Sequence, residues 1–311
     1  MTKRILSILL AVMLIMTVTV LSSCGDSDED NTVQTLDNGD ESDTAADTTE
    51  EGKTTITLPN GDSATVPSTI SSVVTVSPAA ENIFSRLSCD SYVTASYSVT
   101  DDCTDSIVSA APDVVIYDTG ANIDVDTITS AGIVAVEFPT EAESVTSIKN
   151  DYIKFVGTLM GVSYSSEQES LQKGLDQAKA LVAAQTTWVS PTVYFEVSYE
   201  DGTCYTVAPY SYIYEIISIS GGSNVFGSSS DYEGFISVSE DDIIAANPSI
   251  IFTVGLASDI TEREGWSEVS AVASGNVYEI TMNCSYAAAE AANTMYQYFA
   301  VYLGFATEDD F

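Results

Sequence analysis

The sequence predicts an α/β protein of two similar lobes joined by one long helix. A helical pattern near the middle of the chain, over residues 166–187, separates two sets of three apolar, strand-like runs. The stretch APDVVIYDTG parallels NPSIIFTVG, and AGIVAVEF parallels SGNVYEIT. Each has a Pro or Gly break, a buried strand and then a turn, the rhythm of parallel α/β construction. The runs before the helix are Val73–Val76, Val114–Tyr117 and Ile133–Phe138, and those after it are Val193–Val197, Ile250–Val254 and Val277–Thr281.

The central helix is predicted from apolar residues at three- and four-residue spacing: Leu171, Leu175, Ala178 and Val182. Ser165 or Ser166 is expected to cap its start, with Gln168 or Glu169 completing a capping box. Gly174 inside the pattern costs a helix about 1 kcal/mol relative to Ala. At 1.5 Å per residue the helix is about 30 Å long, enough to run from one lobe to the other.

The amino terminus has the pattern of an export signal. Residues 1–23 combine Lys3 and Arg4 with an apolar stretch and the small residues of a lipobox, which ends at Cys24. Cys24 is therefore the predicted lipidation site, anchoring the protein to the membrane. Residues 24–53 are almost entirely acidic and small polar residues, and we expect them to form an extended, disordered tether.

The charge of the chain excludes nucleic acid as a partner. The formal net charge is −37, and residues 54–311 alone carry 35 acidic and six basic residues, about −29. Strongly anionic ligands are also disfavoured unless the few cations gather in a cleft. Among those cations only Arg263 is expected in a cleft loop.

The residues needed for common catalytic chemistry are missing. The chain has no His, and none of the patterns GxGxxG, GxxxxGK[ST] or GxSxG occurs. We therefore expect no enzyme activity, no metal site and no cofactor. Besides Cys24 there are four cysteines, and the sequence does not decide whether they pair: Cys89, Cys103, Cys204 and Cys284.

Aromatic residues are concentrated in the segments that follow the predicted strands. The carboxyl ends of parallel strands face the ligand crevice in α/β sheets, and aromatic rings with a polar tip suit a large, partly apolar ligand. We expect these residues to line a cleft, although packing is the alternative for any one of them. They are Tyr97, Tyr117, Tyr199, Tyr205, Tyr210, Tyr212, Tyr286 and Trp266.

Several stretches resemble one protein family in family order. These are TITLPNGDSATVPSTISSVVTVSPAAENIF, APDVVIYDTG, AGIVAVEFPT, IKNDYIKFVGTLMG, the long PTVYFEVSYEDGTCYTVAPYSYIYEIISISGGSNVFG, VSEDDIIAANPSIIF and GWSEVSAVASGNVYEI. They resemble the class III substrate-binding proteins of bacterial ABC importers, which carry cobalamin, ferric siderophores and haem. The resemblance implies two Rossmann-like lobes at residues 54–164 and 191–311, joined by an interlobe helix within 165–190.

The resemblance also implies a function and partners. The protein would bind a solute between its lobes and dock onto an ABC permease driven by its ATPase, with little lobe movement. Acidic residues near the first turn of one helix in each lobe meet permease arginines in this family, and here Glu81 and Asp241 occupy those regions. The chain departs from the family pattern between Tyr97 and Ala111, where it is shorter.

The low positive charge favours a corrinoid ligand over a ferric siderophore. A large ligand of low net charge can stack on aromatic faces, whereas an anionic chelate needs cationic donors. A surface adhesion or matrix-interaction lipoprotein that keeps the fold without transport is the alternative function.

Overall fold

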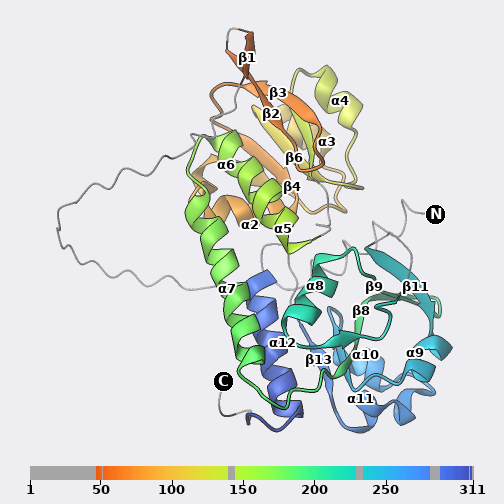
Figure 1. Ribbon diagram of the computed structural model, residues 1–311. Coiled ribbons are helices and arrows are strands. Elements are labelled where there is room, and N and C mark those ends of the chain that lie inside the picture. Colours follow the sequence, from red (N-terminus) through yellow and green to blue (C-terminus); the bar gives the residue numbers. More distant parts are fainter. Residues whose placement is uncertain are drawn as a thin grey trace, which may run out of the picture.

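The computed structural model describes residues 47–50, 52–138, 144–228, 234–280, 288–307 and 309. The predicted signal segment 1–23, Cys24, residues 25–46 of the tether, Tyr286 and Cys284 lie outside the described residues. Figure 1 shows two α/β lobes, one built from the first half of the chain and one from the second, with a long helix along one side of the molecule.

The first lobe is organised around a four-stranded parallel sheet in the order β5-β4-β6-β7. Three antiparallel strands, β1–β3, precede it in the chain, so the expected disorder of residues 24–53 is wrong for residues 47–50 and Lys53, which form β1 and the start of β2. The strands are β1 (Asp47–Glu50), β2 (Lys53–Thr57), β3 (Ser63–Pro67), β4 (Val73–Val76), β5 (Val93–Ser96), β6 (Val114–Asp118) and β7 (Val134–Phe138). The helices are α2 (Pro78–Arg86), η1 (Asp90–Tyr92), α3 (Thr104–Ala110), α4 (Val125–Ser130), α5 (Val145–Ser147), the π-helix η2 (Ile148–Ile153) and α6 (Lys154–Met160).

The second lobe has a six-stranded mixed sheet. Its main order is β11-β9-β8-β12-β13, with β10 also pairing to β8. Strands β8, β10, β12 and β13 are parallel, and β9 runs antiparallel to both of its neighbours, β8 and β11. The strands are β8 (Thr192–Glu200), β9 (Thr203–Val207), β10 (Ser223–Asn224), β11 (Phe235–Ser239), β12 (Ile250–Thr253) and β13 (Val277–Glu279). The helices are α8 (Tyr212–Ile219), α9 (Glu240–Ala246), α10 (Ala257–Thr261), η3 (Trp266–Glu268), α11 (Ser270–Ala273) and α12 (Ala288–Tyr302).

The connecting helix is α7 (Ser165–Ala183), which is 19 residues long. Leu171, Leu175 and Ala178 are buried, as their spacing predicts. The predicted cap is wrong, because Tyr164 occupies the N-cap position and makes no side-chain cap hydrogen bond. The helix also ends four residues before the predicted Thr187.

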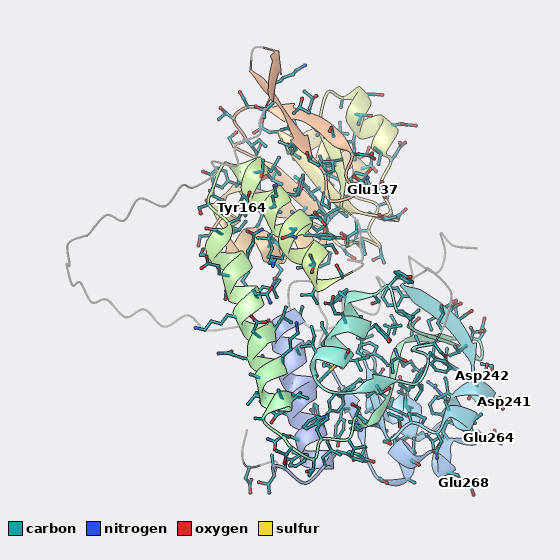
Figure 2. All side chains as sticks on the ribbon, in the orientation of Figure 1. Glu137, Tyr164, Asp241, Asp242, Glu264 and Glu268 are labelled. Carbon is teal, nitrogen blue, oxygen red and sulfur yellow. The ribbon has the colours of Figure 1, made fainter. Side chains whose placement is uncertain are left out.

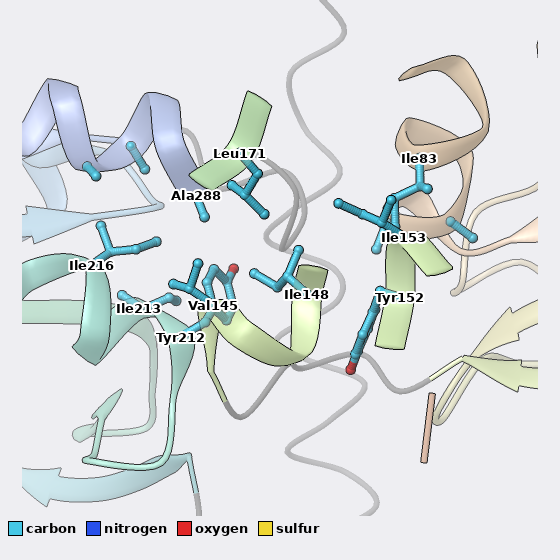
Figure 3. Packing of buried hydrophobic residues seen from close by; sticks show 14 of the residues in the cluster. Ile83, Val145, Ile148, Tyr152, Ile153, Leu171, Tyr212, Ile213, Ile216 and Ala288 are labelled. Atoms are coloured by element: carbon cyan, nitrogen blue, oxygen red, sulfur yellow. The ribbon is translucent and has the colours of Figure 1, made fainter. Parts of the chain in front are cut away.

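Apolar packing across the junction joins the two lobes into one core. A single cluster of buried side chains runs from the first-lobe sheet through α7 to the second-lobe sheet, and Figure 3 shows its central part. The side chains labelled there come from α2, α5, η2, α7, α8 and α12: Ile83, Val145, Ile148, Tyr152, Ile153, Leu171, Tyr212, Ile213, Ile216 and Ala288. Because close-packed interiors resist deformation, this cluster fixes how the lobes sit relative to one another.

Polar contacts cross the same junction. The backbone N–H of Val145, at the start of α5, donates to Glu215 Oε2 on α8 at 2.8 Å. On the other side of α7, Arg86 at the end of α2 pairs with Glu290 on α12, with Nη2 and Oε1 2.6 Å apart. The side chains of this ion pair are 37% and 58% exposed, so its contribution to stability is small. Its position nevertheless ties the first lobe to the last helix.

The structure explains why a glycine, Gly174, stands inside α7, which the sequence did not reveal. Helix α12 packs along α7, and a Cβ built at Gly174 would lie 2.7 Å from the Cβ of Ala289. The small residue therefore permits the close approach of the two helices, which outweighs its unfavourable helix propensity.

Two further sequence questions are answered in the described part of the chain. Cys89, Cys103 and Cys204 are buried free thiols, so the local pair Cys89–Cys103 is not formed. Within the described part of the chain, no helix combines the length and apolarity needed for a membrane span.

The Gly174 contact gives a first prediction. Gly174→Ala should lower the free energy of unfolding by about 1–2 kcal/mol, because the overpacking cost of 1–3 kcal/mol exceeds the gain in helix propensity. Urea unfolding followed by circular dichroism measures this. The double variant Gly174→Ala/Ala289→Gly should recover most of the loss, since it restores the space. A single variant as stable as the wild type would contradict the close approach.

Candidate functional site

The carboxyl ends of the parallel strands form the candidate ligand-facing edge of each lobe. In the first lobe the chain connects β4 to β5 on one side and then returns to β6 on the other, so the strand order reverses between β4 and β6. Ligands bind outside the carboxyl ends of strands at such reversals in open α/β sheets. The residues at this point are Ser77, directly after β4, and Asp118, the last residue of β6.

Ser77 and Pro78 explain why α2 begins at this edge. The Ser77 Oγ accepts a hydrogen bond from the Ala80 N–H at 3.1 Å and so caps the helix. Pro78 occupies the first helical position, where its missing N–H costs nothing. The helix amino terminus is thereby held against the ends of β4 and β6.

Asp118 is a buried acid that the sequence analysis missed. Its side chain is 3% exposed, and its Oδ1 has no hydrogen-bond partner among the described residues. Burial raises the pKa of the Asp118 carboxyl to about 7, and a hydrogen bond from the Ser77 side chain offsets part of this shift. Asp118 therefore changes charge near neutral pH. The rule used for the tyrosines, a side chain directly after a buried strand, could have identified it.

Tyr97 and Tyr117 lie in the first lobe near the ends of β5 and β6, the two strands that flank β4. Both are half-buried and pack against the same apolar cluster, between the sheet and the helices α3 and α4. Burial raises the pKa of the Tyr117 phenol, and the charge of Glu137 on β7 raises it further. The structure thus places both tyrosines on the same face of the first-lobe sheet.

In the second lobe the charged side chain of Arg263 is buried and paired with an acidic side chain. Its Nη1 and Nη2 donate to the Glu196 carboxylate at 2.9 and 3.0 Å, and the two side chains are only 8% and 6% exposed. Its guanidinium carbon lies 4.0 Å from the ring centre of Tyr199 and 4.5 Å from that of Trp266. Glu240 accepts hydrogen bonds from Tyr199 Oη and Trp266 Nε1, each at 2.8 Å.

This cluster corrects two predictions for the second lobe. Trp266 is fully buried, so its ring packs in the core instead of lining a cleft. Arg263 is committed to Glu196, so it is not a free cation in a cleft loop. The same holds for Tyr212, a core residue that is 2% exposed. Spacing along the chain placed these residues after strands, but the loops fold back onto the lobe.

The other second-lobe tyrosines differ in exposure. Tyr205 on β9 is half-buried, whereas Tyr199 and Tyr210 are exposed. Tyr210 is 48% exposed and directly precedes Ser211, the N-cap of α8. Because α8 packs against α5 of the first lobe, Tyr210 lies beside the junction of the lobes, and it is the exposed aromatic side chain best placed for a ligand there.

A surface cavity of about 520 Å³ lies elsewhere, between α2, α7 and α12. Its lining comes from the middle of α7 and the start of α12, together with Arg86. None of these residues follows a sheet strand. No group of three or more acidic or Cys side chains in the described residues could hold a metal ion.

The acidic residues at the first turns of α2 and α9 differ in how they are used. Glu240 is bonded to Tyr199 and Trp266, and Asp242 forms a capping box with Ser239, with Ser239 Oγ and Asp242 Oδ2 2.6 Å apart. The side chain of Asp241 is exposed and makes no hydrogen bond or ion pair among the described residues, and the same is true of the Glu81 side chain on α2. Figure 2 shows Asp241 and Asp242 on the outer face of the second lobe, near Glu264 and Glu268.

Comparison with known proteins places this fold. The sequence matches the family described as "Periplasmic binding protein" over residues 49–283. The chain belongs to the periplasmic binding protein family. Two α/β lobes joined by one long helix are the class III arrangement of this family. Its members bind solutes and are not enzymes, which confirms the expected class of protein.

Individual relatives of this periplasmic binding protein are distant. An uncharacterized ABC transporter substrate-binding lipoprotein of Bacillus subtilis, YvrC, is 24% identical over 184 residues, 57% of each chain. The match thus spans little more than half the length of that curated relative.

Three solved structures share the fold at low sequence identity. The haem-binding RhuT of Roseiflexus sp. RS-1 has a TM-score of 0.64 at 16% identity, covering 75% of this chain and 99% of its own. The vitamin B12-binding BtuF of Vibrio cholerae has a TM-score of 0.56 at 15% identity, covering 75% and 98%. CeuE of Helicobacter pylori, in a Ni-His complex, has a TM-score of 0.65 at 14% identity, covering 83% and 91%.

Asp118 gives a second prediction, on stability. An unfolded Asp has a pKa of about 3.9, so the raised pKa of about 7 means that the folded state favours the protonated form. Stability from this group is fully present below pH 4 and is lost as pH rises through 7, in total about 4 kcal/mol. Relative to the wild type, Asp118→Asn should therefore be more stabilising at pH 8.5 than at pH 4.5. Thermal unfolding of both proteins at the two pH values measures this difference.

Asp113, directly before the same strand, provides the matched control. Hydrogen bonds from the backbone and side chains of Ser71 and Ser72 lower its pKa, so its contribution has the opposite sign and is lost as pH falls. Asp113→Asn should destabilise most at high pH. Identical pH profiles for the wild type and Asp118→Asn would show that Asp118 does not titrate between these values.

Proposed function

We propose that this protein is the substrate-binding protein of an ABC importer, anchored to the membrane through Cys24 and located outside the cytoplasm. Membership of the periplasmic binding protein family supports this role, and the relative YvrC carries the description of a substrate-binding lipoprotein. The protein would hold its solute at the strand edges between the two lobes and deliver it to a permease powered by an ATPase. No bond is made or broken.

The proposed ligand is a large chelate, with a corrinoid preferred over a ferric siderophore. The structural neighbours include proteins whose titles name haem, vitamin B12 and a nickel–histidine complex. Among large chelates of this kind, a corrinoid needs the fewest cationic side chains in its binding site, because its periphery is rich in uncharged amides. Haem and many ferric siderophores carry carboxylates or a net negative charge.

The observation that carries this preference is the location of the six Lys and Arg side chains in residues 54–311. Arg263 is paired with Glu196 in the second lobe. The other five lie on α2, η2, α6 and α7, the elements around the lobe connection: Arg86, Lys149, Lys154, Lys173 and Lys179. None of them follows the carboxyl end of a sheet strand. Recognition at those ends must therefore rely on aromatic surface and on uncharged hydrogen bonds.

Ligand binding provides the third prediction. The full chain in detergent should bind cyanocobalamin with an affinity that changes little between low and high salt, since few charges face the ligand. Tyr210→Ala should weaken binding by about 1–3 kcal/mol if the ring packs against the ligand. Isothermal titration calorimetry with cyanocobalamin, cobinamide and a panel of ferric siderophores measures both.

The control for Tyr210 is Tyr302→Ala. Tyr302 is similarly exposed, at 42%, but ends α12 away from the strand edges, so its removal should leave affinity unchanged. Salt-sensitive binding of an anionic ferric complex, with no response to corrinoids, would overturn the ligand preference. Absence of binding to every chelate tested would favour a surface-interaction lipoprotein with the same fold.

Docking to the permease is the second part of the proposal. Glu81 and Asp241 each lie in the first turn of a helix, one in each lobe, where the backbone fixes the position of the carboxylate. Both side chains are exposed and make no hydrogen bond among the described residues, so both remain available for bidentate contacts with arginines of a permease. Their neighbours Glu240 and Asp242 are already used within the second lobe.

The fourth prediction tests this docking surface. Glu81→Lys/Asp241→Lys should abolish uptake and stimulation of the permease-bound ATPase while leaving chelate affinity intact. Asp105→Lys/Asp259→Lys is the control, since it reverses two exposed first-turn acids of α3 and α10. Normal transport by the first variant, or equal loss in both, would remove the assignment of these two carboxylates.

A further inference from the structure

The strand reversal in the first lobe contains a buried polar atom without a partner. It is Asp118 Oδ1, at the end of β6. Strands β4 and β6 are paired with Val76 level with Tyr117, so Asp118 lies beside Ser77, the N-cap of α2. The first backbone N–H groups of a helix have no intrahelical partner, and the Ala79 N–H is one of these in α2. An unsatisfied acceptor and the amino terminus of a helix therefore belong to the same corner of the lobe.

Unsatisfied buried polar groups are rare in folded proteins and call for an explanation. Leaving such a group without a partner costs about 1–3 kcal/mol, and α2 would not need this arrangement for its own capping, which Ser77 provides. The location is the edge at which open α/β sheets bind ligands. The cost is recovered if a ligand supplies the missing partners.

We propose that Asp118 is the polar contact of the first lobe with the ligand, and that it pairs through Oδ1 with an uncharged amide group. This contact rests on the proposed function and identifies one of its binding residues. A protonated carboxyl group offers an O–H donor and a C=O acceptor, and a primary amide offers the complementary pair. The Ala79 N–H is a second donor for the amide carbonyl oxygen.

The neutral form of Asp118 is the one that suits this role. An ionised carboxylate lacks the donor and would bring an unpaired charge into a buried site, which is unfavourable. Because Oδ1 is covered before binding, pairing should accompany entry of the ligand group. In such a site, with little water, the resulting hydrogen bonds are strong.

The groups around Asp118 do not supply a competing charge. On its own face of the sheet, the packed helices α2 and η2 bring Glu81, which is exposed, and Tyr152, which is buried against Phe138. Tyr117 and Glu137 sit at the preceding register positions of β6 and β7, and their side chains point to the opposite face. Burial is accordingly the leading cause of the shift in the Asp118 pKa, with no charged neighbour contributing.

The test is the pH dependence of cyanocobalamin binding by the full chain in detergent. If only the neutral carboxyl binds, a group with a pKa of about 7 predicts that affinity falls about 30-fold between pH 5.5 and 8.5. Asp118→Asn keeps a donor and an acceptor, so it should bind at both pH values with an affinity close to that of the wild type at pH 5.5. Asp118→Leu should bind more weakly by about tenfold or more at pH 5.5.

The controls separate this contact from the proposed function. Asp113→Asn, directly before the same strand, should keep the pH dependence of the wild type. Wild-type binding that is independent of pH, or Asp118→Asn with an unchanged pH profile, would overturn the contact while leaving the chelate-binding function standing. If Asp118→Leu fails to fold, the comparison of Asp118→Asn with the wild type still decides. Absence of cyanocobalamin binding in every variant would contradict the ligand and this contact together.

Discussion

The apolar core that crosses from one lobe to the other is the constraint on which the rest of this structure depends. Side chains from α2, η2, α7, α8 and α12 belong to one cluster, so neither lobe has a separate interior at the junction (Figure 3). The bond from Val145 to Glu215 and the close packing of α7 on α12 at Gly174 reinforce it. The two strand edges are thus held at a separation set by packing, in keeping with the small lobe movements expected for a single connecting helix.

The distribution of charge explains what such a binding edge can recognise. The chain is strongly acidic. In the second lobe Arg263 forms an ion pair with Glu196 and lies close to the rings of Tyr199 and Trp266. Burying a charge in this way requires a well-placed partner, and the bidentate geometry provides one. What remains at the strand edges is aromatic surface, exemplified by Tyr210, and a carboxyl group at Asp118 that is neutral in mildly acidic conditions. Free acidic side chains are left for the outer surface, as at Asp241 (Figure 2).

The sequence predicted the order of elements better than the use of individual residues. The run Val73–Val76 coincides with β4, and the run at Val114 lies within β6, because strands buried on both faces are continuous in apolar residues. The end of α7 and its cap were wrong, since caps depend on local geometry that spacing does not encode.

Site residues were harder to predict because position after a strand does not determine the path of a loop. Trp266 and Arg263 follow β12 in the chain, yet the segment folds back so that both contact Glu240 or Glu196 in the lobe interior. Asp118 directly follows the predicted run Val114–Tyr117 and could have been named from its position, but its burial and its missing partner are visible only in the packed structure. Family membership, in contrast, followed from many weak matches in a single order.

The fixed relation of the two lobes is the central claim, and a distance between them tests it most directly. Spin labels can be introduced at exposed Asp126 on α4 and Glu268 on η3, and pulsed electron paramagnetic resonance then measures their separation. The account predicts one narrow distance distribution in the free protein, with the same centre after saturation with cyanocobalamin. A broad or two-peaked distribution in the free protein would contradict it, because the lobes would then move independently of the shared core.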